Sequence, residues 1–212
     1  MKKSVVTLVL AAALLVSMIG MASAVSQTWY LDSDSHPAGE RYMWKNDTLN
    51  CSGQVNVGLL PRTWVADKPA QCDVTFPSGT WNGQLKWEAG IALSDNVYYR
   101  IGIYNSTTNT FTIRGYNYTL LSLALSTDPV TEPFSITTDE PFTVHEGEYL
   151  AFQFKSASIS IGRDIITDGD SWIKSPDSDP GYPVPEFSTL LLMSTGLLAL
   201  AGYVGLRRRR NV

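Results

Sequence analysis

Between residues 25 and 185 the apolar residues follow the two-residue period of β-strands rather than the longer period of an amphipathic helix. Short runs of β-branched and aromatic residues are separated by clusters of Gly, Pro, Asn, Asp and Ser, which is typical of many short strands joined by turns. In residues 99–104, for example, Tyr99, Ile101 and Ile103 share one face and Arg100 points to the other. The pattern predicts an all-β, antiparallel β-sandwich.

The expected strands are numerous enough for two packed sheets. The two cysteines lie too close together in sequence to join opposite sheets as they do in an antibody domain, so the sequence favours a jelly-roll-like sandwich over an immunoglobulin-like one. Residues 105–109 read as a hairpin loop and residues 145–148 as a turn. The expected strands are residues 27–31, 42–44, 54–60, 63–66, 72–76, 83–88, 98–104, 110–116, 118–126, 134–137, 142–144 and 149–154, with weaker patterns at 159–161 and 171–173.

The first 24 residues have the pattern of a signal peptide. A short basic start precedes an apolar stretch at residues 5–16, and Ala22, Ser23 and Ala24 supply small residues where a signal peptidase reads the chain. Cleavage is expected after Ala24, which leaves residues 25–174 as the sandwich. The alternative is an uncleaved N-terminal anchor.

The C-terminal segment, residues 185–212, predicts a membrane helix. Residues 187–206 are uncharged, and twenty helical residues span about 30 Å, the thickness of a bilayer's hydrocarbon core. A basic cluster follows, as it does on the cytoplasmic side of membrane helices. The expected localisation is therefore the cell surface, with the preceding residues outside the membrane. The motif residues are Pro185, Glu186 and Phe187, and the basic residues are Arg207, Arg208, Arg209 and Arg210.

This arrangement of motif, helix and arginines resembles the PEF-CTERM sorting signal of archaeal surface proteins. The resemblance covers about an eighth of the chain and implies that a membrane-embedded archaeosortase cuts near the Pro-Glu-Phe motif and transfers the new C-terminus to a lipid. The alternative is a permanent membrane anchor. Residues 175–184, rich in Pro, Ser and Asp, are expected to form an extended stalk between the sandwich and the membrane.

The charge of the exported part is strongly negative. Six of the 16 basic residues lie in the two terminal segments and all 20 acidic residues lie in residues 25–186, so this part has a formal net charge of −10. Such a surface repels a phosphate backbone, which argues against nucleic acid as a partner. Envelope polysaccharides and other surface proteins stay open as partners.

Export also affects the expected covalent chemistry. Cys51 and Cys72 are expected to form a disulfide in an oxidising exterior, closing a loop of 22 residues and contributing about 3 kcal/mol; two free thiols are the alternative. Four Asn-x-Ser/Thr sequons are candidate glycosylation sites. Cys51 would crowd the sequon at Asn50. The other three sequons are at Asn46, Asn105 and Asn117.

Two features suggest ligand binding. Six tryptophans lie in the exported part, and Trp81, in the turn-like residues 78–83, is the one expected to be exposed and to stack on a sugar ring. Acidic loops could offer oxygens to Ca²⁺, although none completes an EF-hand pattern and no cofactor is otherwise expected. The candidate metal ligands are Asp164, Asp168 and Asp170, with a second acidic cluster at Asp32 and Asp34.

Enzymatic motifs are absent from the sequence. His36 and His145 are the only histidines, and there is no Gly-x-Ser-x-Gly elbow, His-Glu-x-x-His motif or phosphate-binding loop. Paired carboxylates of a glycoside hydrolase stay open, because geometry rather than sequence spacing defines them. The sequence thus predicts a structural or adhesive envelope protein rather than an enzyme, with a carbohydrate-binding module and then a glycoside hydrolase as alternatives.

Overall fold

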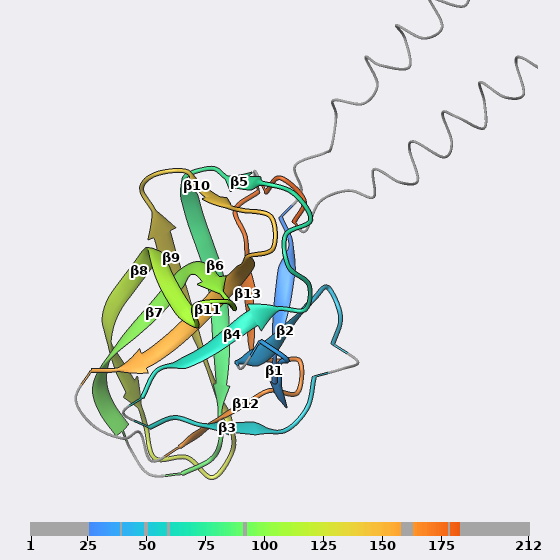
Figure 1. Cartoon of the computed structure of the whole chain (residues 1–212). Coiled ribbons are helices and arrows are strands. Elements are labelled where there is room, and N and C mark those ends of the chain that lie inside the picture. The colour runs from blue at the N-terminus through green and yellow to red at the C-terminus, as the bar shows by residue number, and fades with distance from the viewer. Residues whose placement is uncertain are drawn as a thin grey trace, which may run out of the picture. The chain divides into compact units, whose positions relative to one another are not determined.

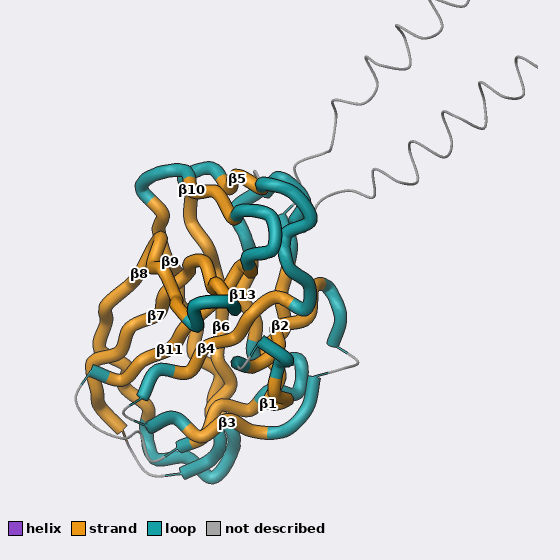
Figure 2. Tube along the Cα trace, in the orientation of Figure 1, coloured by secondary structure: helices purple, strands orange, loops and turns teal. Residues whose placement is uncertain are grey.

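The computed structural model describes residues 26–182 except 39, 49–50, 59, 91–92, 158–162 and 178, and all of these belong to one compact unit. This part of the chain has thirteen strands and no helix, which confirms the all-β prediction (Figure 1). Figure 2 shows the strands in orange, joined by loops in teal. The strands are β1 (Thr28–Ser35), β2 (Arg41–Lys45), β3 (Gln54–Asn56), β4 (Arg62–Ala66), β5 (Val74–Phe76), β6 (Gly79–Trp87), β7 (Leu93–Asn105), β8 (Thr110–Leu123), β9 (Val130–Thr138), β10 (Phe142–Val144), β11 (Tyr149–Ser156), β12 (Asp164–Ile166) and β13 (Trp172–Lys174).

Eleven of these strands form one mixed sheet instead of two separate antiparallel sheets. The order is β3-β12-β6-β13-β1-β2-β4-β11-β7-β8, with β9 paired to β6 and a separate ribbon of β10 and β5. The pairing of β2 with β4 is parallel, which corrects the prediction of purely antiparallel strands. The two halves of the sheet face one another, as in a β-sandwich, because Phe134 of β9 stacks on Tyr99 of β7 and on Phe152 of β11.

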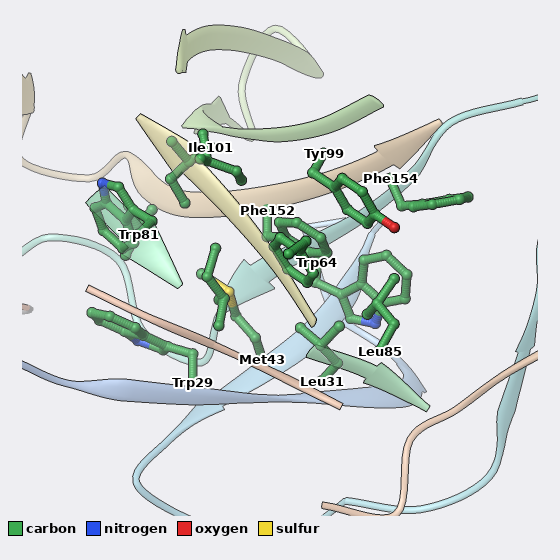
Figure 3. Close-up of a cluster of buried hydrophobic side chains, with 14 of the residues drawn as sticks. Trp29, Leu31, Met43, Trp64, Trp81, Leu85, Tyr99, Ile101, Phe152 and Phe154 are labelled. Atoms are coloured by element: carbon green, nitrogen blue, oxygen red, sulfur yellow. The ribbon is translucent and has the colours of Figure 1, made fainter. Parts of the chain in front are cut away.

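The core lies between these two halves and is rich in tryptophan (Figure 3). Alternate residues of β6 point inward, so Trp81, Leu85 and Trp87 are fully buried. Trp29 of β1 lies 6.0 Å from Trp81, ring centroid to ring centroid, and Trp64 of β4 lies 5.7 Å from Phe152 of β11. The prediction that Trp87 alternates with Leu85 on a buried face is confirmed.

Strand β8 is continuous where two strands were expected. Residues 110–116 and 118–126 were predicted as separate strands, but β8 pairs with β7 throughout, with one irregularity between Ile101 and Gly102. Asn117 does not break the strand because its side-chain Nδ2 donates a hydrogen bond to the carbonyl of Ser135 in β9 (2.9 Å). A Cβ on Gly115 would lie 2.8 Å from the carbonyl oxygen of Thr137, so glycine permits the close approach of β8 and β9.

Other boundaries also differ. The short strand β12 was not predicted, and the expected strand at residues 159–161 lies outside the described residues. The hairpin loop between β7 and β8 is confirmed: the side-chain Oδ1 of Asn105 accepts hydrogen bonds from the backbone N–H groups of Thr107 and Thr108, an arrangement typical of asparagine at a turn.

The predicted stalk is wrong at the described residues 175–177 and 179–182, which pack against the domain. Tyr182 is only 1% exposed and packs between Trp29 and Phe76. Its hydroxyl donates to the carbonyl of Lys68 and accepts from the N–H of Leu150. The proline content of this segment predicted an extended chain. It carries no information about whether the ring of Tyr182 packs into the core, as it does here.

The signal peptide and the sorting segment lie outside the described residues. No helix long and apolar enough to cross a membrane occurs within the part of the chain that the structure describes.

Candidate functional site: the outer face of β7, β8 and β11

Aromatic and basic side chains gather on the outer face of three neighbouring strands. In β8, Tyr116 and Tyr118 alternate with the inward-facing Gly115, Asn117 and Thr119. The strand register places these tyrosines opposite Arg100 and Tyr98 of β7, which in turn lie opposite Gln153 and Lys155 of β11. We call this set the tyrosine face; its members are Tyr98, Arg100, Tyr116, Tyr118, Gln153 and Lys155.

The aromatic part of the tyrosine face is open to solvent. Tyr116 is 62% exposed and Tyr118 is 49% exposed, and Leu120, the next outward residue of β8, is 59% exposed. The rings of Tyr98 and Tyr118 lie 4.6 Å apart at an angle of 34°. Large apolar side chains are common at the surface singly, but a contiguous row along one strand marks a site that binds something.

Arg100 is held in place by its neighbours on both sides. Its Cζ lies 4.7 Å above the ring of Tyr98, and its Nη1 donates to the Oε1 of Gln153 at 2.9 Å. The Nε2 of Gln153 donates to the Oγ1 of Thr63 in β4 at 3.1 Å, which fixes the amide orientation. The guanidinium is thus oriented before any ligand arrives, and only one of its nitrogens has a hydrogen-bond acceptor among the described residues.

The charge of this face contrasts with that of the rest of the domain. Strands β7, β8 and β11 contain the cations Arg100, Arg114 and Lys155, and their only acid is Asp95, which is buried and hydrogen-bonded to Ser156. Among the residues that the structure describes, none of these three cations forms an ion pair. The outer face is therefore a basic, aromatic surface on an acidic domain.

A groove of about 550 Å³ lies on the other side of the β8 edge, where β8 and β9 diverge. Both strands are edges there, since β8 pairs only with β7 and β9 only with β6. The stacked rings of Tyr99 and Phe134 line the groove, and Glu132 is its one charged lining residue. The groove is a polar cleft whose backbone and amide groups can donate and accept hydrogen bonds.

The prediction that Trp81 is exposed in a turn is wrong. Trp81 lies in β6, is 0% exposed and packs against Trp29 and Phe76. Gly79, Asn82 and Gly83 gave this segment the composition of a turn, but the alternation that links Trp81 to Leu85 and Trp87 continues through it. Trp44 and Trp172 are half-buried, and the other four tryptophans are fully buried.

The candidate calcium ligands are engaged with other side chains. Lys86 Nζ lies 2.8 Å from a carboxylate oxygen of Asp168 and 2.7 Å from one of Asp170, and Asp164 accepts a hydrogen bond from Asn56. Burial opposes ionisation of the Asp168 carboxyl, but the hydrogen bonds from Lys86 and from the backbone N–H of Asp170 together hold its pKa below its usual value. In the described part of the chain no three His, Cys, Asp or Glu side chains converge on a metal position. The amine of Lys86 thus lies beside the two carboxylates that the sequence suggested as Ca²⁺ ligands.

The expected disulfide is not formed: Cys51 and Cys72 are both free thiols. Their loops pack in different neighbourhoods. Cys51 follows β2 and lies near Asp47, whereas Cys72 precedes Asp73, which hydrogen-bonds to the turn after β10. Burial and the nearby carboxylates raise the pKa of the Cys51 thiol to about 12, so this thiol is a poor nucleophile at neutral pH.

The sequons differ in how free their acceptor nitrogens are. Asn46 is exposed, and only its Oδ1 is engaged, by the N–H of Thr28. Asn105 donates weakly to Glu148 (3.4 Å), while the Nδ2 of Asn117 donates to Ser135 beside the groove. Asn50 lies outside the described residues. The geometry therefore favours modification at Asn46 over Asn117.

The tyrosine face was not predicted from the sequence, although a signal for it exists. Residues 110–123 carry large apolar side chains at both odd and even positions, so whichever set is buried, the other must be exposed on the opposite face. These residues were divided into two strands at Asn117 in the sequence analysis, so the alternation along one continuous strand was not recognised. Arg100 was correctly placed on the face opposite Tyr99, but its aromatic neighbours were not identified.

No family model and no curated protein matches the chain. A CocE/NonD family hydrolase from Staphylococcus aureus is similar in structure, with TM-score 0.54 and 11% identity over 71% of this chain and 36% of that chain. A second structure of a CocE/NonD family hydrolase from the same organism gives TM-score 0.50 and 12% identity with the same coverage. A family 35 carbohydrate-binding module from Clostridium thermocellum has 12% identity over 70% of this chain and 89% of that chain, but its TM-score of 0.28 is too low to support an argument.

The chain thus spans about a third of the length of the hydrolases that it resembles. Identities of 11% and 12% show a shared β fold alone.

Proposed function

We propose that this protein is an exported cell-surface β-sandwich, jelly-roll-like, that adheres to polysaccharide through the tyrosine face. The observation that supports this function is the exposed row of Tyr116 and Tyr118 on β8, beside Tyr98 and Arg100. The apolar face of a sugar ring stacks on a flat aromatic ring, and neighbouring polar groups then fix its orientation.

The dimensions of the face suit a chain molecule rather than a small ligand. The face crosses three adjacent strands, which is about 10 Å at the usual strand spacing. Tyr116 and Tyr118 lie in a row along β8, and Tyr98 of β7 lies beside Tyr118. A polymer can contact such a row at several sugar units at once, which raises its affinity without a deep pocket.

The test is binding of the full-length protein, in detergent, to immobilised neutral and acidic polysaccharides. We expect at least one polymer to bind, and Tyr118→Ala to weaken that binding about threefold to tenfold, the value of one lost aromatic stacking contact. Leu60→Ala is the matched control, because Leu60 is 72% exposed but lies in the loop before β4 and is not a member of the tyrosine face.

Two results would refute the proposal. One is no binding across a broad panel of polysaccharides by protein that retains its folded circular-dichroism spectrum. The other is binding that Tyr118→Ala and Leu60→Ala weaken equally, because the loss would then not depend on the tyrosine face.

The proposal also includes retention at the membrane by residues 185–212. The chain is expected to begin at Val25 and, after processing by an archaeosortase, to end near Glu186 with a lipid attached. The mass of the protein purified from its native membrane, intact and after peptide mapping, tests this. A mass that includes residues 187–212 would instead support a permanent helical anchor.

A further inference from the structure

We propose that the tyrosine face selects acidic polysaccharides, and that Arg100 is the residue that binds a carboxylate of a uronic acid unit. This inference rests on the proposed function and names the class of polymer that the face recognises. It follows from the position of Arg100 among the tyrosines and from the charge of the three strands.

Arg100 has hydrogen-bond donors that are not used within the described part of the chain. Its Nη1 donates to Gln153, and its Cζ lies 4.7 Å from the centroid of the Tyr98 ring, so two neighbours hold the side chain. Within the described part of the chain its Nε and Nη2 have no acceptor. A guanidinium presents its N–H groups in a planar fork that matches the two oxygens of a carboxylate.

The tyrosines place a sugar next to that fork. Tyr116 lies directly opposite Arg100 across the β7–β8 pair, and Tyr118 lies opposite Tyr98. A sugar ring stacked on Tyr116 therefore has Arg100 beside it, one strand spacing away, and a ring stacked on Tyr118 has Arg100 at the diagonal position. A uronic acid carries its carboxylate at the edge of the ring, which is where the guanidinium lies.

The charge distribution supports an acidic rather than a neutral ligand. Lys155 lies opposite Tyr98 on the other side, and Arg114 is exposed at the irregularity in β8. The exported part of the chain has a net charge of −10, so it repels polyanions everywhere except at a local excess of cations. The local excess of cations therefore makes this face more favourable for a polyanion than the acidic remainder of the surface.

The experiment compares polygalacturonate with its fully methyl-esterified form, using the full-length protein. The two polymers share the sugar units and differ in the negative charge of the carboxyl group. We expect the acid to bind at least tenfold more tightly than the ester at 0.15 M salt. Arg100→Gln should lower the affinity for the acid about tenfold, to about the affinity of the wild-type protein for the ester.

Arg100→Lys separates charge from geometry, because lysine keeps the charge and loses the planar fork. We expect it to restore less than half of the lost affinity on a logarithmic scale. Arg62→Gln is the matched control, since Arg62 is a cation at the start of β4 whose Nε is bound to the carbonyl of Asn56. This variant should bind like the wild-type protein.

The possible failures of the two proposals are distinguishable. Equal affinity for acid and ester, with both lost in Tyr118→Ala, would overturn the acidic preference and keep polysaccharide adhesion. No binding to either polymer or to any other polysaccharide would overturn both. Equal binding of dextran sulfate and polygalacturonate would overturn the assignment of a carboxylate. Self-association that Tyr118→Ala abolishes would also overturn it, because the face would then bind a second copy of this chain.

Discussion

The domain contains two groups of aromatic residues that differ in kind as well as in place. The tryptophans of β1, β4 and β6 fill the core, with Trp29, Trp64, Trp81 and Trp87 all fully buried. The tyrosines of β8 are exposed, at 62% for Tyr116 and 49% for Tyr118. The difference shows that the position of a residue in its strand, rather than the size of its ring, decides whether the ring is buried in the core or exposed at the surface.

The physical chemistry of the two side chains agrees with this division. A tyrosine ring keeps its hydroxyl in water at a surface, whereas a buried polar group loses free energy unless it has a partner. The indole N–H groups of Trp29, Trp81 and Trp87 have no hydrogen-bond partner among the described residues, so the large apolar area that these rings bury must outweigh that loss.

The largest expected effect is the loss of a core ring. Trp81→Ala removes a fully buried side chain that contacts Trp29, Phe76 and Phe142, and should lower the free energy of unfolding by about 3–5 kcal/mol. Urea denaturation followed by circular dichroism measures the change. A loss below about 1 kcal/mol would mean that Trp81 is exposed, as the sequence alone suggested, and the comparison of the two groups would fail.

The next effect concerns Tyr182, a tyrosine that belongs to the core. Tyr182→Phe keeps the ring but leaves the buried N–H of Leu150 without its acceptor, so the free energy of unfolding should fall by about 1–3 kcal/mol. Asp177→Asn, in the same segment but exposed, is the control. Equal stability of wild type and Tyr182→Phe would restore the extended stalk for residues 175–182.

A smaller effect, dependent on pH, involves Asp179. This carboxyl is buried, its Oδ1 accepts from Gln27 and from the N–H of Gly181, and its Oδ2 has no partner within the described part of the chain. Burial raises its pKa in the folded state above the unfolded value of about 3.9. Stability from the protonated form is therefore present at low pH and is lost as pH rises through the folded pKa.

Asp179→Asn replaces the protonated acid by a neutral amide that cannot ionise. Thermal unfolding from pH 4 to pH 7 should show the wild type losing stability relative to this variant. Parallel curves across the range would show that Asp179 keeps an ordinary pKa. Asp67, whose pKa burial also raises, is unchanged in the variant, so it affects both curves alike.

The smallest expected effect on stability is at the tyrosine face. Tyr118→Ala should change the free energy of unfolding by no more than about 0.5 kcal/mol, as is usual for exposed positions. The same substitution is expected to weaken polysaccharide binding, so Tyr118 should affect binding with little effect on stability, whereas Trp81 should affect stability. A loss of several kcal/mol would show that Tyr118 supports the fold, and it would then be unsuitable as a probe of binding.

The sequence predicted the fold class and most strands, because period-two alternation depends on neighbouring residues only. Strand β10 was predicted with its observed bounds, and β4, β7 and β11 were found with shorter limits. Pairing partners depend on residues far apart in the chain, so neither the parallel pair of β2 with β4 nor the continuity of β8 was predicted. In β8, pairing with β7 continues through Asn117, whose side chain donates to Ser135 of β9.

The candidate site was predicted poorly for a related reason. A binding face is formed by side chains from several strands, and the register that joins Arg100 to Tyr116 and Gln153 appears only when β7, β8 and β11 are aligned. Trp81 was chosen for its residue type and for the glycines around it. The composition of residues 78–83 is that of a loop. The ring of Trp81 is nevertheless buried, because it packs against Trp29.

The attachment of residues 175–182 to the domain has a mechanical consequence. The backbone of Gln27 is hydrogen-bonded to Ser175, and Thr28 lies opposite Lys174, so the two ends of the described chain are adjacent. A pull on the chain beyond Tyr182 acts first on this segment, whose fully extended length is about 25 Å at roughly 3.3 Å per residue. Force between β8 and the C-terminal end of the chain would pass through the paired strands from β8 to β13 and then through residues 175–182. We expect these residues to detach before the strands separate, because side-chain contacts and a few hydrogen bonds hold them rather than a strand pairing.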